Sequence, residues 1–390
     1  MDESLSMLGA IVSDRVLPQT VPVDAWPGLI RLALRHGLGP MLLWSVKRRA
    51  PEITAAPEWN PLVTVARRSA VSYVLLDNSQ RRFQAALDGA GIPAIWLKGI
   101  ALAKTVYPQP ALRSMSDLDV LVPYDQRLAA LDAAQRQGFQ LYNSANKLLS
   151  RQERQAWHLS HHYELRDEKT NASITELHFY LLGPDKSLLP LDRMGWFWEQ
   201  TQTVGESAAR FTIFKPEANL LYLAAHTILQ HGEALSYLRQ YYDINLVIAH
   251  DALRWDLVID QAVILGWAYA TARALTRASE HFGASVPAEV FAQLRARRPT
   301  HDHVARAVRL QSRGARWEQT RATAVSLSFT NRVRLGLKIL LPTRNYMRRR
   351  YAIPPSRSVW PYYPYRWLDQ GKDITIWAWK WLVRRRNRPS

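Results

Sequence analysis

Two aspartates, Asp117 and Asp119, open an otherwise apolar segment, "SDLDVLV". Side chains at positions i and i+2 of a strand point to the same face, so an extended conformation brings both carboxylates together. Like charges on one face repel each other unless a cation lies between them. Mg²⁺ takes carboxylate oxygens and shares its other positions with substrate phosphates. The pair therefore predicts a Mg²⁺ (or Mn²⁺) site, with Lys98 and Arg113 nearby to contact phosphate.

A third carboxylate is expected on a neighbouring strand, because phosphoryl and nucleotidyl transfer through two metals usually needs one more ligand or base. Glu176 in "ITELHF" is the first candidate, and Glu164 in "YELR" is the alternative. His178 falls two residues beyond Glu176 and hence on the same face of the strand. It is predicted either to contact phosphate or acceptor, or to be a structural histidine.

The elements that must position these residues follow from hydrophobic periodicity. Residues 1–91 and 216–294 show helical spacing, and between them the expected order is β-α-β-α-β-β-β. The predicted elements are a strand at 92–97, a helix from 99 to about 107, a strand at 117–122, a helix at 124–138, and strands at 139–142, 161–166 and 173–179. This order predicts an α+β fold with a small mixed β-sheet. The expected domains are a helical N-terminal segment (1–91), an α/β core with the metal site (92–215), a helical domain closing the cleft (216–330) and a tail (331–390).

Composition limits the functional class. The 390 residues contain no cysteine, which excludes disulfides, thiolate zinc sites and cysteine nucleophiles, and fits a cytoplasmic protein. No uninterrupted apolar run reaches 18 residues, and the N-terminus lacks the basic and apolar regions of a signal peptide. We therefore expect a cytoplasmic protein, with peripheral attachment to a membrane as an alternative.

The basic charge is concentrated in the tail. Residues 331–390 hold 15 Lys and Arg against 2 acidic residues, within a formal net charge of +18 for the whole chain. Five tryptophans accompany them, at positions 360, 367, 377, 379 and 381. Arginine with tryptophan suits an anionic membrane surface or RNA. The other interpretation is that these aromatic residues pack on the protein itself.

The sequence "LKGIALAKTVYP…LRSMSDLDVLV", followed by "ELH", resembles the uncharacterised bacterial nucleotidyltransferase family of the DNA polymerase β-type superfamily. The resemblance covers roughly residues 60–290. It implies a cytoplasmic, Mg²⁺-dependent enzyme that moves NMP from an NTP to an acceptor hydroxyl with release of pyrophosphate, often in polysaccharide or peptide natural-product pathways. The acceptor would be a small molecule, a peptide or protein, or RNA. The implied residues are Asp117, Asp119 and Glu176 for metal and catalysis; Lys98, Gly99, Arg113 and Ser116 for nucleotide; and His178, His226, Arg239 and Asp243 for substrate.

One feature departs from the wider superfamily, in which Gly-Ser after the first strand holds the triphosphate. This chain has Lys98-Gly99 there and a longer stretch before Asp117. Lys98 and Arg113 are expected to supply the phosphate contacts instead, with the amides of the following helix N-terminus aimed at the anion. A plain strand-to-helix turn also explains this glycine.

Other interpretations remain open at this stage. The aspartates could form a surface turn, or the metal-binding Asp-x-Asp of a nucleotide-sugar glycosyltransferase. A catalytically degenerate member of the family could bind nucleotide or polyanion and scaffold a biosynthetic or membrane partner. The histidines of "HLSHH" (158–162) together with His178 suggest zinc, but in a strand or loop they are not expected to converge. For the enzyme, Asp119→Ala is expected to abolish turnover while leaving the melting temperature nearly unchanged or slightly raised, because a repulsion between carboxylates is removed.

Overall fold

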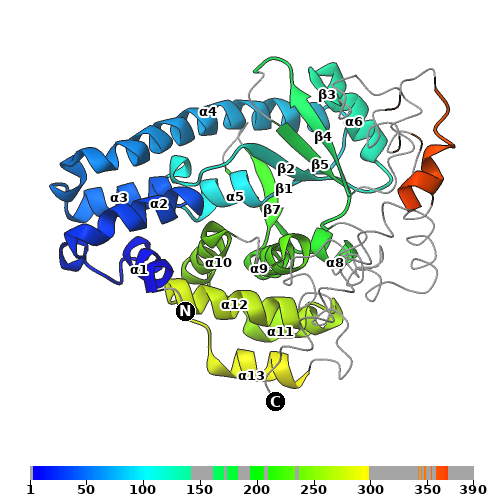
Figure 1. The fold of residues 1–390 in the computed structure, drawn as a ribbon. Coiled ribbons are helices and arrows are strands. Elements are labelled where there is room, and N and C mark those ends of the chain that lie inside the picture. Colours follow the sequence, from blue (N-terminus) through cyan, green and yellow to red (C-terminus); the bar gives the residue numbers. More distant parts are fainter. Residues whose placement is uncertain are drawn as a thin grey trace. The chain divides into compact units, whose positions relative to one another are not determined.

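Two compact units, residues 1–308 and 309–390, make up the chain in the computed structural model. The structure describes residues 3–141, 161–170, 174–182, 194–205, 210–232, 237–297, 341, 344, 347, 353 and 357–367. All helices and strands given below lie in the first unit (Figure 1). His158, residues 298–330 of the expected helical domain, and the last three tryptophans of the tail lie outside the described residues.

A five-stranded mixed sheet forms the centre of the first unit. Its order is β1-β2-β5-β4-β3, and only the β2–β5 pair is parallel. The strands are β1 (Ile95–Leu97), β2 (Asp117–Leu121), β3 (Phe139–Leu141), β4 (His162–Asp167) and β5 (Ile174–His178). With α5 (Lys98–Thr105) after β1 and α6 (Arg127–Arg136) after β2, the expected β-α-β-α-β-β-β order and the α+β class with a small mixed sheet are confirmed.

Strand alternation separates the two faces of this sheet. Leu118 and Val120 of β2 join Trp96 and Leu177 in an apolar cluster with α4 (Asn60–Asp88), α5 and α6. Asp119 and Glu176 occupy the intervening positions and so face the other side. The register that buries Leu118 and Leu177 against the helices also places both carboxylates on the opposite face of the sheet.

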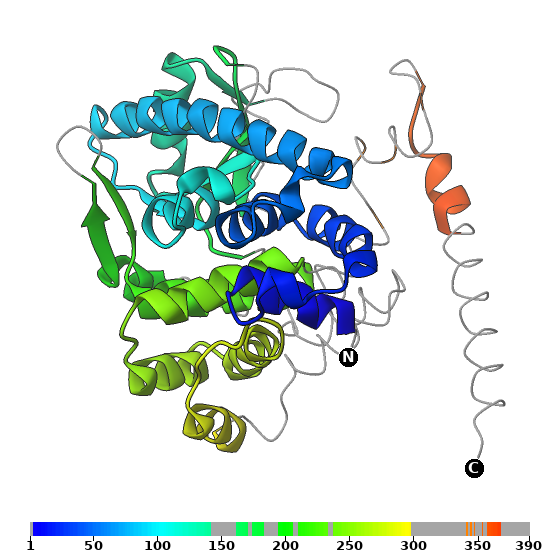
Figure 2. The same ribbon diagram turned by 90° about the vertical axis from the view of Figure 1, so that its left-hand side faces the viewer.

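The helices that precede the sheet in the sequence and those that follow it share a second hydrophobic core. Leu8, Trp26 and Leu62 from the N-terminal helices lie in the same buried cluster as Leu221 and Leu275 from the later ones. Figures 1 and 2 show α1 (Glu3–Val12) beside α12 (Ala268–Phe282). The remaining helices are α2 (Trp26–Arg35), α3 (Gly39–Arg49), α9 (Pro216–Ala225), α10 (Leu238–His250), α11 (Trp255–Ile264) and α13 (Ala288–Ala296).

Two local features were not expected from the sequence. A hairpin of β6 (Thr201–Val204) and β7 (Phe211–Phe214) follows the short helix α8 (Met194–Glu199). Its strands are only four residues long and β6 is largely exposed, so hydrophobic alternation gives little signal. Directly after α9, residues His226–His231 form a π-helix, a rare conformation that often marks functional sites.

Nothing in the described residues forms a helix long and apolar enough to cross a membrane. In the second unit, Val359 and Tyr363 lie in a small buried cluster with Met347 and Ile353. Trp360 and Trp367 are exposed, at 59% and 45%. The described part of the tail therefore both packs some of its own apolar side chains and leaves two tryptophans accessible.

Candidate active site

Asp119 and Glu176 are register partners on the parallel strands β2 and β5. His178, two residues further along β5, lies between the two carboxylates: its Nε2 is 3.1 Å from Asp119 Oδ1 and 3.1 Å from Glu176 Oε2. Asp119 and His178 are buried, at 4% and 1% exposed, and Glu176 is partly exposed. The expected juxtaposition of the second aspartate with Glu176 and His178 is therefore present.

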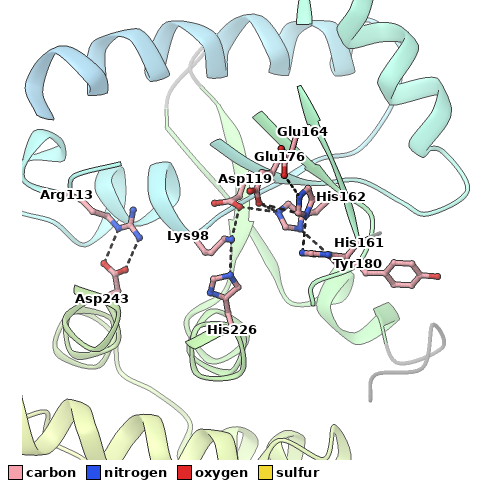
Figure 3. A network of polar contacts seen from close by, with 11 residues as sticks. Lys98, Arg113, Asp119, His161, His162, Glu164, Glu176, Tyr180, His226 and Asp243 are labelled. Atoms are coloured by element: carbon pink, nitrogen blue, oxygen red, sulfur yellow. Dashed lines mark hydrogen bonds and ion pairs between the residues drawn. The ribbon is translucent and has the colours of Figure 1, made fainter. Parts of the chain in front are cut away.

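A buried lysine neutralises this cluster. Lys98 Nζ lies 2.7 Å from Asp119 Oδ1 and donates to His226 Nε2 at 3.1 Å (Figure 3). Burial would lower the pKa of Lys98, but Asp119 and other neighbouring groups raise it overall. Burial would raise the pKa of Asp119, but Lys98 and then His178 hold it well below its usual range. Lys98 is thus an ammonium and Asp119 a carboxylate at neutral pH.

His226 is the neutral member of this set. Burial, followed by the positive charge of Lys98, lowers its pKa well below the usual range, so its ring is neutral and its Nε2 accepts the hydrogen bond from Lys98. It is the first residue of the π-helix, and its ring lies 4.5 Å from that of His231, centroid to centroid. The helix after the sheet therefore contributes a histidine that holds Lys98 from the side opposite Asp119.

Asp117 differs from Asp119. Within the described residues its side chain forms no hydrogen bond or ion pair, and it is half-buried. Burial, and then the negative charge of Asp119, raise its pKa. Ser116, just before it, is exposed. An acidic group without a partner beside an ionised one is the arrangement expected where a cation binds.

Arg113 is held within the protein by Asp243 of α10. Its Nε and Nη2 bond the two carboxylate oxygens at 3.0 and 2.8 Å, and Tyr107 Oη donates to Asp243 Oδ1 at 2.8 Å. Arg239, also on α10, donates to the carbonyl of Ser114. These contacts fasten the loop before β2 to α10. Phosphate contact by Arg113 and substrate contact by Arg239 and Asp243 stay predictions.

The turn between β1 and α5 brings the backbone unusually close to this loop. Lys98 has a φ of 41°, in the left-handed region that side chains disfavour. A Cβ added at Gly99 would lie 3.1 Å from Arg113 Nη1 and 3.3 Å from Met115 Sδ. The structure therefore gives Gly99 a packing reason, and α5 begins without a side-chain cap, which leaves its first amides available.

Two of the histidines of "HLSHH", His161 just before β4 and His162 at its first position, lie close to His178. His158 lies outside the described residues, so the expectation that the histidines at 158–162 do not all converge stays a prediction. His162 is the cross-strand partner of His178, and one ring nitrogen of each of His161, His162 and His178 lies within 4.8 Å of the others. His161 can approach the other two rings because it lies in a bend just before the strand and escapes the strict alternation that separates strand neighbours. Glu164 is the register partner of Glu176 and shares its face. Its side chain is 67% exposed against 23% for Glu176.

Two donor sets that contain carboxylates lie in this region. Asp119, Glu176 and His178 form one, and His162, Glu164 and Glu176 another, with the ligand atoms of each set within 4.8 Å of one another. Carboxylate oxygens fit Mg²⁺ or Mn²⁺, and Asp117 adds one more on the same strand face as Asp119. The residues present therefore fit the divalent cation that the sequence predicts. Glu176 is the better placed third carboxylate because it lies opposite Asp119.

Fold and site together define a protein with an α+β core and a carboxylate cluster assembled from two adjacent strands. The chain belongs to the family described as uncharacterised nucleotidyltransferases, whose model matches residues 22–283. Among solved structures it is similar to an antigenic nucleotidyltransferase-like protein from Paracoccidioides brasiliensis, with 14% identity and a TM-score of 0.34, over 58% of this chain and 92% of that one. Comparison with curated proteins gives no match.

Two contributors to the site were missed from the sequence. Tyr107 falls in the quoted motif "TVYP", and its hydroxyl bonds Asp243, 136 positions later. His161 was named as a possible zinc ligand, but it was not predicted to lie beside His178. The role of Tyr107 has no local signal, because its partner lies on α10, and the approach of His161 to His178 depends on the pairing of β4 with β5.

Proposed function

We propose that this protein is a Mg²⁺-dependent nucleotidyltransferase that moves NMP from an NTP to an acceptor hydroxyl, with release of pyrophosphate. Family membership supports nucleotidyl transfer in general. The observation that carries the finer proposal is the register pairing of Asp119 with Glu176 and the alignment of Asp117 on the same face. Three carboxylates at one place on a rigid sheet are the ligand set that such a reaction requires.

Each residue then has a role that its surroundings favour. Asp117 and Asp119 would hold Mg²⁺, and Glu176 would complete the set as a ligand or draw the proton from the acceptor hydroxyl. When bound, the cation neutralises charge developing on the transferred phosphoryl group. Asp117 suits this role because its carboxylate has no protein partner among the described residues.

Lys98 supports the proposal from the opposite side of the site. Its ammonium is buried, charged at neutral pH and held between Asp119 and His226. A lysine at this point can donate to a triphosphate oxygen while the uncapped amides of α5 contribute further donors. Arg113 is bonded to Asp243, and Arg239 is bonded to the carbonyl of Ser114. We therefore propose that both arginines position the segment "RSMSD", which contains Ser116 and Asp117.

The test uses the full chain with each of the four α-labelled NTPs, Mg²⁺ or Mn²⁺, and total RNA or clarified lysate as acceptor. An Asp117→Asn/Asp119→Asn variant and the exposed-loop control Asp125→Asn run alongside. The expected result is labelled product with the wild type and Asp125→Asn, and none with the double variant. Nuclease or protease sensitivity of the product identifies the acceptor class.

Calorimetry of NTP binding with and without Mg²⁺ separates the remaining outcomes. Mg²⁺-dependent binding that leads to no transfer in any extract favours a degenerate member that binds nucleotide and scaffolds a partner. No Mg²⁺-dependent binding at all overturns the proposal.

A further inference from the structure

We propose a second metal site beside the carboxylate cluster of β2 and β5, formed by His161, His162 and His178, the last of which also contacts that cluster. Its occupant would be a borderline divalent cation of the Zn²⁺ class rather than Mg²⁺. One ring nitrogen from each histidine lies within 4.8 Å of the others. The site does not depend on nucleotidyl transfer, and its test measures metal binding directly.

The backbone brings these three rings together. His162 and His178 are cross-strand partners in the antiparallel β4–β5 pair, so their side chains leave the sheet on one face. His161 precedes β4, and its carbonyl accepts the amides of Phe179 and Tyr180 at 3.0 and 3.3 Å. These two bonds tie His161 to the chain just past His178. The cluster therefore rests on a paired strand end and not on the chance approach of long side chains.

The rings themselves are packed closely. Their centroids lie 4.2 Å apart for His161 and His162, 5.0 Å for His162 and His178, and 5.4 Å for His161 and His178. His162 Nδ1 is 3.0 Å from His161 Nε2. The structure leaves the rings of His161 and His162 partly accessible and buries His178. A cation can thus enter from the solvent side and meet the buried ligand last.

The chemistry of the donors selects the ion. Imidazole nitrogens suit Zn²⁺, Co²⁺, Ni²⁺ and Cu²⁺, whereas Mg²⁺ prefers oxygen ligands and its own waters. Three histidines leave one tetrahedral position for water or for another ligand. Glu164 and Glu176 lie beside the cluster, with carboxylate oxygens 3.5 and 4.0 Å from His162 nitrogens. These carboxylates can orient the ring of His162 or complete the coordination.

His178 links this site to the carboxylate cluster. Its Nε2 faces Asp119 and Glu176, and its Nδ1 faces the carbonyl of Tyr180 at 3.3 Å. Histidines that bind metal through one nitrogen commonly donate the other N–H to a carboxylate. A cation in the histidine site would therefore fix the orientation of His178 toward Asp119 and Glu176.

The experiment uses untagged, chelator-treated full-length protein titrated with Zn²⁺ and with Co²⁺, followed by calorimetry and by the visible bands of bound Co²⁺. His161→Ala and His162→Ala are the test variants. His250→Ala, an exposed histidine at the end of α10, is the matched control, and Asp117→Asn leaves all three histidine ligands in place. Thermal melts establish that each variant is folded.

We expect one tight site in the wild type, in His250→Ala and in Asp117→Asn. Each test variant should lose affinity by at least about 100-fold, since even outer-shell changes at metal sites cost about 10- to 100-fold. His161→Ala lies outside the strand and is the informative variant if His162→Ala fails to fold. Unchanged affinity in His161→Ala, or no Zn²⁺ or Co²⁺ binding stronger than that of a single surface histidine, overturns the proposal.

Discussion

Arg113 and Asp243 lie 130 positions apart in the chain and meet in a buried two-bond ion pair. Asp243 is 1% exposed and Arg113 is 7% exposed. The pair joins the loop that leads into β2 to the face of α10, and Tyr107 adds a third bond to the same carboxylate. The position of Asp117 and Asp119 therefore depends on a residue of the helical region after the sheet.

The first prediction follows from this pair. Asp243→Ala leaves a buried guanidinium without its partner, so we expect the free energy of unfolding to fall by about 3–5 kcal/mol. The exposed pair Arg297–Asp260 provides the control, because Asp260→Ala should change the free energy of unfolding by less than about 1 kcal/mol. Urea denaturation measures both. Equal, small losses in the two variants would show that the buried pair contributes little.

The two aspartates of β2 should respond differently to neutralisation. Asp119 binds Lys98 and His178, so Asp119→Asn should lower the free energy of unfolding by about 1–3 kcal/mol. From the sequence alone an unchanged or slightly raised melting temperature was expected for Asp119→Ala, because only the repulsion between the aspartates was considered; the ion pair with Lys98 leads to the opposite prediction. Asp117 has a raised pKa and no side-chain partner among the described residues, so Asp117→Asn should leave stability unchanged or slightly higher. Thermal melts at pH 7 compare the two, and the reverse order would contradict this account of the site.

The pH dependence of the free energy of unfolding should show a contribution from Asp167, which lies on the face of the sheet away from the site. Its buried carboxylate accepts bonds from Ser79 at 2.6 Å and from Arg82 at 2.9 Å. Burial would raise its pKa, but these bonds lower it overall. A lowered folded-state pKa means stabilisation that is complete above the unfolded value of about 3.9 and is lost as the pH falls below it.

The matched comparison is the wild type with Asp167→Asn. We expect the wild type to be the more stable by a constant amount from about pH 7 to pH 5, and the difference to shrink below about pH 4. Urea midpoints across this range give the result. A difference that grows on acidification would mean that the carboxylate is not stabilised in the folded protein.

The tail gives a prediction about partners. With 15 basic and 2 acidic residues at 331–390, it should bind polyanions with an affinity that falls steeply with salt. Exposed Trp360 and Trp367 would add stacking or interfacial contact. We expect the full chain to bind RNA or anionic vesicles and a chain ending at 330 to lose this binding. Gel shift and vesicle sedimentation distinguish the two partners. Equal binding by the truncated chain would place the polyanion-binding site outside the tail.

The sequence by itself determined the α+β class, the order of helices and strands along the chain, and the face that Glu176 and His178 share. These follow from alternation and helical spacing, which are local properties of the chain. The short strands β6 and β7 were missed because four residues carry too little periodicity.

Only the tertiary structure decided which charges meet. Lys98 could have been a surface residue, yet it lies between Asp119 and His226; Arg113 bonds Asp243, and His161 joins His162 and His178. Each of these contacts joins different elements or passes through a bend, so it depends on how sheet and helices pack. Burial then gives the contacts their effect, because removing water makes an unpaired charge costly and a paired one stable.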